Sequence, residues 1–159
     1  MKVTLNLLFF LFLLVVQVNA QNSIDKPAFY KTLASGNTAA IDFQLSIVQA
    51  SDIPEKNAFE GTLMMKKAQL VSKPKEKLSL FKSGRMRLES SIASDKENTE
   101  YRFLRLIIQE HAPKIVKYRK NLEEDSELVR TNFKTLSLEL QQIITDYSKK
   151  SSILKISQP

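Results

Sequence analysis

The segment that decides the fold is TEYRFLRLIIQEHAP, residues 99–113. Apolar side chains recur in it at helical spacing, so Tyr101, Leu104 and Ile108 form one face of a helix and Phe103 widens that face. Only a narrow strip of this helix is polar, and the proline at its end stops it. A helix that is apolar nearly all round either occupies the centre of a bundle or lines a groove. The segment therefore predicts an all-α protein.

Helix-start and helix-stop signals divide the rest of the chain in the same way. Asp25 precedes Pro27 as a start signal, and Asn37 or Thr38 restarts the helix after Gly36. We expect helices within residues 25–36, 37–51, 53–71, 72–95, 99–112 and 113–121, and one long helix from the acidic segment 123–127 to Tyr147. The predicted fold class is all-α, with six or seven antiparallel helices in stacked hairpins that form a tetratricopeptide-like or irregular bundle.

Gly61 is an unusual residue inside the helix predicted for residues 53–71. Glycine within a helix costs about 1 kcal/mol relative to alanine. A glycine at such a position allows another backbone to come close, because it has no Cβ. We therefore expect a second helix to approach the chain closely at Gly61.

The first twenty residues have the pattern of an export signal. Lys2 gives a positive start, residues 7–16 form an unbroken apolar run, and Val18-Asn19-Ala20 provides a cleavage site. A membrane-spanning helix needs roughly 20 apolar residues, about twice the length of this run. An uncleaved membrane anchor is the alternative, but we expect a cleavable signal peptide and a mature chain that begins near Gln21.

The predicted organisation is a signal peptide at residues 1–20, a single helical domain at residues 21–147 and a flexible C-terminal tail at residues 148–159. The chain contains no cysteine. An exported domain without disulfides must be held together by packing alone. These features favour a bacterial protein that is periplasmic or secreted.

Two segments also resemble known helical proteins. LESSIASDKENTEYRFL, residues 88–104, resembles the junction between two repeats of tetratricopeptide proteins, although Lys96 stands where that family has proline. The resemblance implies stacked helical hairpins. The combination of GTLMMKKA, KLSLFKSG and NTEYRFLRLIIQE is similar to a group of small exported bacterial helical proteins of uncharacterised function, and this similarity implies no activity.

The polar strip on the helix of residues 99–112 is the first candidate site. Arg102, Arg105 and Gln109 follow one another at helical spacing along it. Arg85 interrupts an apolar stripe on the preceding helix. Glu110, near the C-terminal end of its helix, faces the unfavourable end of the helix dipole and needs a cation from elsewhere, such as Lys66, Lys67, Lys82 or Arg85.

Two interpretations of this cluster remain open. In the first, the arginines form buried ion pairs that fix the register of the helices, since an unpaired buried charge costs several kcal/mol. In the second, Arg85, Arg102 and Arg105 line a pocket for a carboxylate or phosphate. The candidate binding residues are Arg85, Arg102, Arg105, Gln109, Glu110, Lys66 and Lys67.

The sequence carries no recognisable catalytic or metal-binding pattern. His111 is the only histidine, and no other residues are spaced to form a metal site with it. A histidine at the end of a helix interacts favourably with the helix dipole. The chain also lacks a nucleophile motif and a glycine-rich phosphate loop. We expect a protein that is not an enzyme and needs no cofactor or metal.

Charge patterning restricts the classes of partner. The chain has 24 lysines and arginines against 17 acidic residues, a net charge of +7, and the cations concentrate in residues 66–87. An anionic small molecule or membrane surface is a possible partner of such a segment, whereas no motif for nucleic acid is present. We expect an exported, non-enzymatic module for protein–protein interaction or envelope assembly. The alternative is a binder of a small anionic ligand or anionic lipid through the arginines.

Overall fold

The computed structural model describes residues 23–156, and every regular element in that range is helical. The predicted all-α fold of six or seven helices is confirmed. The elements in chain order are α2 (Lys26–Ala34), α3 (Thr38–Ala50), α4 (Lys56–Leu70), α5 (Pro74–Ser94), α6 (Thr99–His111), the 3-10 turn η1 (Lys114–Val116), α7 (Leu122–Asn132), the 3-10 turn η2 (Phe133–Thr135) and α8 (Leu138–Ser148).

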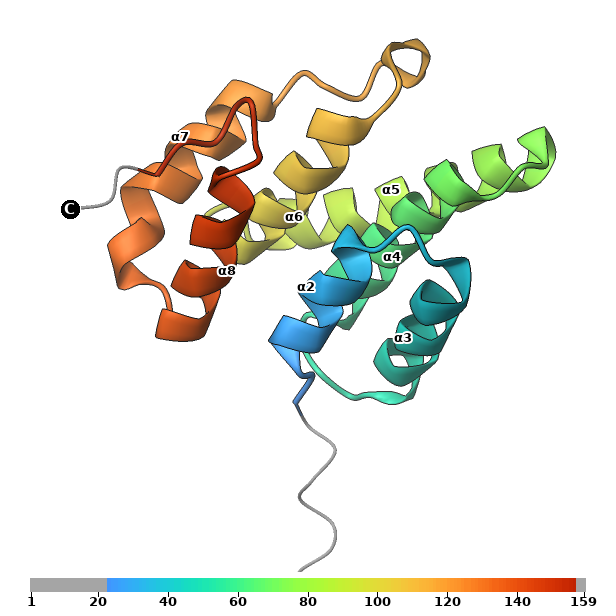
Figure 1. The fold of residues 1–159 in the computed structure, drawn as a ribbon, viewed down its shortest axis with the longest axis horizontal. Helices are drawn as coiled ribbons and strands as arrows, with labels where there is room; N and C mark the ends of the chain where they lie inside the picture. Colours follow the sequence, from blue (N-terminus) through green and yellow to red (C-terminus); the bar gives the residue numbers. More distant parts are fainter. Residues whose placement is uncertain (1–22, 157–159) are drawn as a thin grey trace, which may run out of the picture.

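The helices are arranged around α6, the segment from which the fold was predicted (Figure 1). α4 and α5 form the longest hairpin, and α6 packs against both of them. α7 packs on α6, while α2 and α3 pack on each other and α3 also packs on α4. α2 meets α8, so the two ends of the described chain lie in contact. Ten of the thirteen residues of α6 are buried, as its nearly continuous apolar surface requires.

Side-chain caps fix three of the predicted helix starts. Asp25, Asn37 and Asn98 each accept a hydrogen bond from the backbone N–H three residues later, at 2.9–3.1 Å. Such a cap satisfies one of the backbone donors that an α-helix leaves unpaired at its first turn. The choice between Asn37 and Thr38 is settled in favour of Asn37.

The predicted helix at residues 113–121 is wrong. Only the short turn η1 forms there, because Lys117 adopts a left-handed backbone conformation with φ 49° and ends it. A left-handed residue cannot continue a right-handed helix. The turn brings Tyr118 back into the core, where it is buried, while Ile115 stays exposed.

The predicted long final helix is also wrong, because it is two helices, α7 and α8. The chain leaves the helical conformation at Leu136, which is extended, and Ser137 caps α8 through the N–H of Leu140. The apolar spacing across this region looked continuous because Phe133 and Leu136 still pack against the core. Hydrophobic periodicity therefore identified the buried face correctly but missed the corner within it.

The α4–α5 hairpin depends on two glycines that face each other. A Cβ placed on Gly61 would lie 2.6 Å from the carbonyl oxygen of Gly84, and one placed on Gly84 would lie 2.5 Å from that of Gly61. No side chain fits within such a separation, so the two backbones are in direct contact. The close approach predicted at Gly61 is confirmed, and Gly84 is the residue that makes it reciprocal.

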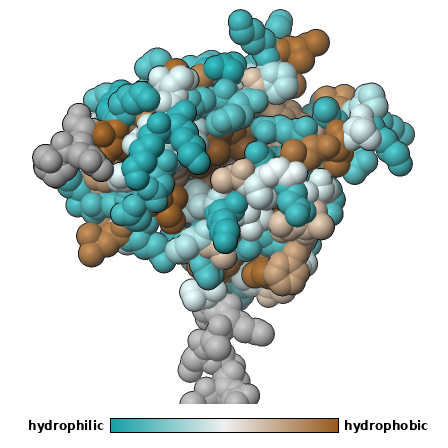
Figure 2. All heavy atoms as spheres, viewed as in Figure 1, coloured by the Kyte–Doolittle hydropathy of each residue, from teal (hydrophilic) through white to brown (hydrophobic). Residues whose placement is uncertain are grey.

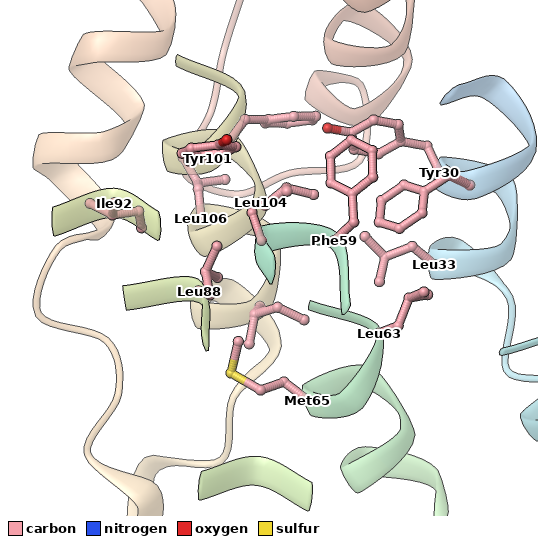
Figure 3. Close-up of a cluster of buried hydrophobic side chains, with 14 of the residues drawn as sticks. Tyr30, Leu33, Phe59, Leu63, Met65, Leu88, Ile92, Tyr101, Leu104 and Leu106 are labelled. Carbon is pink, nitrogen blue, oxygen red and sulfur yellow. The ribbon is translucent and has the colours of Figure 1, made fainter. Parts of the chain in front are cut away.

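A single hydrophobic cluster joins these helices (Figure 3). α2, α4, α5 and α6 all contribute to the part of it that the figure draws. Its labelled members are Tyr30, Leu33, Phe59, Leu63, Met65, Leu88, Ile92, Tyr101, Leu104 and Leu106. Phe29 and Phe59 stack within the same cluster, with ring centroids 4.5 Å apart. Burial of this apolar surface is the main force that holds the helices together.

The chain after α8 remains packed on the fold up to Ile156. Ser151 and Leu154 are buried, and the Ser151 hydroxyl accepts hydrogen bonds from the N–H groups of Ile153 and Leu154. The prediction of a flexible tail from residue 148 is therefore wrong for its described part. The serines and lysines of this segment suggested exposure, whereas Leu154 anchors it in the core.

The predicted signal peptide at residues 1–20 lies outside the described residues and stays a prediction. Within residues 23–156, none of the helices combines the length and the apolar character needed to cross a membrane.

Candidate functional site

Arg102 and Arg105, the two arginines on the polar strip of α6, are both paired with carboxylates from α7. Arg105 binds Asp125 through two nitrogens, Nε and one terminal nitrogen, each 2.7 Å from a carboxylate oxygen. Arg102 contacts the same carboxylate, with its Nε 3.0 Å from Asp125 Oδ1, and also pairs with Glu124. Asp125 is completely buried, so one carboxylate from α7 balances two guanidinium groups of α6.

Glu89 of α5 completes this arginine cluster. Its carboxylate accepts a hydrogen bond from Arg105 at 3.0 Å and another from the Tyr118 hydroxyl at 2.6 Å. Burial raises the pKa of Tyr118 and the hydrogen bond to Glu89 raises it further, so the hydroxyl remains a donor at neutral pH. The cluster thus links α5, α6, α7 and the segment that follows η1, and Arg102 Nε is the one buried side-chain nitrogen or oxygen of the described residues that makes no hydrogen bond.

The charges of the arginine cluster are balanced by carboxylates of the fold itself. Burial acts to lower the pKa of Arg105, but the hydrogen bonds and charges of Asp125 and Glu89 raise it above its ordinary value. Burial raises the pKa of Asp125, although the hydrogen bonds from Arg105 act against this. Three carboxylates surround two arginines, so the first interpretation, an internal ion-pair network, fits the geometry. The residue that sequence reasoning missed is Asp125, whose partners lie twenty or more positions earlier in the chain.

The other predicted site residues make contacts of their own and do not form a pocket with Arg102 and Arg105. Arg85 is exposed, and its guanidinium lies over the ring of Tyr118 at 4.8 Å. Lys67 pairs with Asp42 of α3 at 2.6 Å. Gln109 is buried and binds the side chain and backbone of Asn121. Gln109 therefore fixes the start of α7, while Arg85 and Lys67 make separate contacts.

Glu110 accepts hydrogen bonds from the C-terminal end of the described chain, where a cation was predicted as its partner. The Tyr147 hydroxyl donates to it at 2.6 Å, and so do the hydroxyls of Ser151 at 2.7 Å and Ser152 at 2.8 Å. The Ser152 backbone N–H donates to the same carboxylate. Burial acts to raise the pKa of Glu110, but these hydrogen bonds outweigh it and lower the pKa to about 2. The predicted partners Lys66, Lys67, Lys82 and Arg85 form no ion pair with Glu110 within residues 23–156.

A groove of about 630 Å³ lies between α2, α4, α6 and α8. Figure 1 shows α8, α6 and α2 following one another across the molecule, with α4 behind. The walls are mainly apolar. They include Leu33, Phe103, Ile107, Ile108, Ile143 and Tyr147.

Polar side chains of both signs surround the groove. His111 lies at one edge, where its Nδ1 is 3.0 Å from the carbonyl oxygen of Ile107. Asp146 lies at another edge and pairs with Lys149. The remaining charged rim residues are Lys31, Lys66, Glu139 and Lys150.

Lys66 differs from the other cations of the rim because it is half-buried. Within residues 23–156 it forms no ion pair and no side-chain hydrogen bond. Burial lowers the pKa of its amine, since transfer out of water disfavours the charged form. An amine in this position gains from any anion that enters the groove, whereas the arginines already have their carboxylates.

The groove has apolar walls and charged side chains at its rim. Within the described residues, no group of three histidine or acidic side chains is placed to hold a metal ion. His111 contacts a backbone carbonyl one turn earlier, the position expected of a histidine at a helix end. Searches of protein-family models, curated proteins and solved structures found no match to this chain. Geometry and charge therefore carry the functional argument.

Proposed function

We propose that the protein is a non-enzymatic binding protein whose groove between α2, α4, α6 and α8 takes a small amphiphile. The ligand has an elongated apolar body and one anionic group, a carboxylate or a phosphate. The apolar body lies along α6, and the anionic group pairs with Lys66. The sequence suggested an anionic ligand at the arginines, and this proposal moves it to the groove.

The size and lining of the groove support a small ligand. Pockets for small molecules usually have volumes of roughly 300–1,000 Å³, mainly apolar walls and a few polar groups that orient the ligand. The groove has a volume of about 630 Å³ and walls of aliphatic and aromatic side chains. Its charged groups lie on the rim and its apolar groups on the walls, which suits a molecule with one polar end.

The amine of Lys66, which has no ion pair within residues 23–156, is the observation that carries the proposal. A half-buried cation beside apolar walls costs free energy unless an anion accompanies it. Lys67, its neighbour in sequence, already has Asp42 at 2.6 Å. Of these two adjacent lysines, only Lys66 is left to pair with a ligand.

Calorimetric titration with decanoate, decyl phosphate and the neutral decanol tests the proposal. We expect Lys66→Met to weaken the binding of the two anions by at least about tenfold, because a hydrogen bond to a charged group contributes roughly 1.5–3 kcal/mol. Decanol should bind the variant as it binds the wild type. The matched control Lys67→Met should change none of these affinities.

A filling substitution supplies a second readout. Ile107→Trp narrows the groove without removing a charge, so it should weaken the binding of decanoate and of decanol equally. Absence of heat and of thermal stabilisation with all three probes at millimolar concentration would overturn the proposal. Equal losses of anion affinity in the Lys66→Met and Lys67→Met variants would show that net charge alone, and no specific contact with Lys66, attracts the anions.

The predicted role in protein–protein interaction or envelope assembly stays a second proposal. Phe43 and Ile47 favour it, because they are exposed one turn apart on the outer face of α3, with 69% and 39% of their surface accessible. An apolar pair on one helix face is a usual contact for a partner protein. Export through the predicted signal peptide would place either function in the periplasm or outside the cell, and crosslinking in native envelopes would reveal a partner.

A further inference from the structure

Two basic projections extend from the body of the protein. The first, which we call the hairpin tip, comprises residues 72–79 at the start of α5, and every residue in it is exposed. The second is the η1 turn, residues 113–117, in which only Val116 is partly covered. Figure 1 shows both at the same end of the molecule, the tip in green and the turn in gold. Both depart from the compact helical body.

The cations on these projections have no internal partners. Lys73, Lys75 and Lys77 lie on the hairpin tip, and Lys114 and Lys117 lie on the η1 turn. Within residues 23–156 none of the five forms an ion pair. The arginine cluster uses carboxylates from α5 and α7, whereas the projections carry a single acidic residue, Glu76. They therefore present a positive field to solvent.

A shallow groove is lined by residues that follow each projection closely in the sequence. It has a volume of about 380 Å³ and lies between α5 and the segment that follows η1. Lys82, Arg85 and Lys120 supply three cations to its walls, against one carboxylate from Glu89. Glu89 is already occupied by Tyr118 and Arg105, so the cations of this groove remain available to an anion. We call the cations of the groove, of the hairpin tip and of the η1 turn together the basic face.

Exposed aliphatic side chains stand among these cations. Leu78 on the hairpin tip is 52% exposed, Met86 beside the shallow groove is 69% exposed, and Ile115 on the η1 turn is 88% exposed. Figure 2 shows hydrophobic surface beside hydrophilic surface on both projections. A large apolar side chain that stays in water does not gain the free energy of burial. The basic face carries three of the six such residues of the described chain.

We propose that this basic face docks the protein on an anionic lipid bilayer. The lysines and Arg85 attract the headgroups, the shallow groove receives headgroup phosphates, and Leu78, Met86 and Ile115 enter the boundary between headgroups and acyl chains. Lysine and arginine side chains each add to the attraction toward an anionic surface, and inserted apolar side chains add to it. A nucleic acid or another polyanion would use the cations but would leave the aliphatic side chains in water.

The basic face and the ligand groove share no residue. The groove between α2, α4, α6 and α8 uses Lys66 and the apolar walls around it, whereas the basic face belongs to α5 and η1. Binding to a bilayer is therefore independent of the proposed binding of an amphiphile. Failure of one proposal leaves the other in place.

Sedimentation with vesicles of phosphatidylglycerol and phosphatidylcholine tests the docking, with the protein from residue 21 onward. The triple variant Lys73→Glu, Lys75→Glu and Lys77→Glu should lose at least about tenfold in partition at low salt. Acidic residues are favourable in the first turn of a helix, so these changes leave α5 intact. The matched control Lys96→Glu, Lys134→Glu and Lys149→Glu has the same net charge and exposed positions elsewhere, and should retain binding.

Insertion of the apolar side chains is tested by fluorescence. The chain contains no tryptophan, so Leu78→Trp gives a single reporter. Its emission should shift to the blue with anionic vesicles and stay unchanged with phosphatidylcholine alone. Ile115→Ser should weaken the partition of the otherwise wild-type protein severalfold.

Three outcomes would overturn this inference. Absence of partition into anionic vesicles at low salt is the first. Equal losses in the two triple variants would show attraction by net charge alone. Binding of polyphosphate or single-stranded DNA as tight as vesicle binding, with no blue shift of the tryptophan in the Leu78→Trp variant, would assign the face to a soluble polyanion.

Discussion

The arginine cluster and the ligand groove both hold cations beside buried surface, yet they differ in their carboxylates. Arg105 lies within 2.7 Å of two oxygens of Asp125, whereas Lys66 has no anionic partner in the described chain. In the sequence both sites show the same signal, which is a basic residue beside apolar ones. A buried cation is structural when its counter-ion folds with it, and it is a candidate for ligand binding when it does not.

The largest expected effect comes from removal of the shared counter-ion of the arginine cluster. Asp125→Ala leaves two buried guanidinium groups without their common carboxylate, and breaking a buried pair in this way costs about 3 kcal/mol or more. The free energy of unfolding in urea at pH 7 measures this loss. Glu124→Ala removes the exposed partner of Arg102 and should cost less than about 1 kcal/mol. Similar losses in both variants would contradict the assignment of Asp125 as the central group.

A smaller effect is expected at Glu110, which fastens the chain after α8 to the wall of the groove. The pKa of Glu110 is about 2 in the folded protein, below its unfolded value. Its stabilisation is therefore present above the unfolded pKa of about 4.5 and is lost as the pH falls toward 2. Glu110→Gln should cost about 1 kcal/mol at pH 7, with solvent screening taken into account, and almost nothing at about pH 2.

Urea unfolding of wild type and Glu110→Gln across this pH range measures the difference. Limited proteolysis should cut the variant after Ser148 faster than the wild type. A difference in stability that stays constant as the pH falls from neutral through the folded pKa would mean that the charge of Glu110 contributes nothing.

The smallest effect on stability is expected at Lys66, in the region that lacks a counter-ion. The folded pKa of Lys66 is lowered, so the unfolded chain binds its proton more tightly, and wild-type stability rises between the folded pKa and the unfolded value of about 10.5. Lys66→Met should be more stable than wild type at pH 7 by less than about 1 kcal/mol, since the side chain is half exposed. The gap should narrow as the pH approaches the unfolded value. A variant that is less stable than the wild type at neutral pH would reveal a partner for Lys66.

The helical fold could be predicted from the sequence because its signals are local. The caps at Asp25 and Asn37 and the apolar periodicity of α6 each involve residues within a few turns of one another. Gly61 was informative for the same reason, since a glycine inside a strong helix pattern is costly unless another backbone comes close. The corner at Leu136 escaped prediction because both sides of it bury apolar residues with the same spacing.

The candidate site was only partly predictable, because its pairings connect distant parts of the chain. Arg102 and Arg105 were identified as notable residues, but Asp125 lies twenty or more residues further on and gives no local signal. Lys66 was named as a partner for Glu110, whereas Glu110 is held by hydroxyls at the end of α8 and beyond it. Four helices form the groove, and no sequence pattern places α2 beside α8.

The contact between Gly61 and Gly84 has a consequence for how this protein can vary. The two backbones touch at this point, and a side chain at either position would force the helices apart. Insertions or deletions at the turn, beyond Lys66 and Gln69 of the groove, alter how far the hairpin tip reaches and leave the contact between the glycines in place. The reach of the hairpin tip and the packing of the helical body can therefore vary independently of each other.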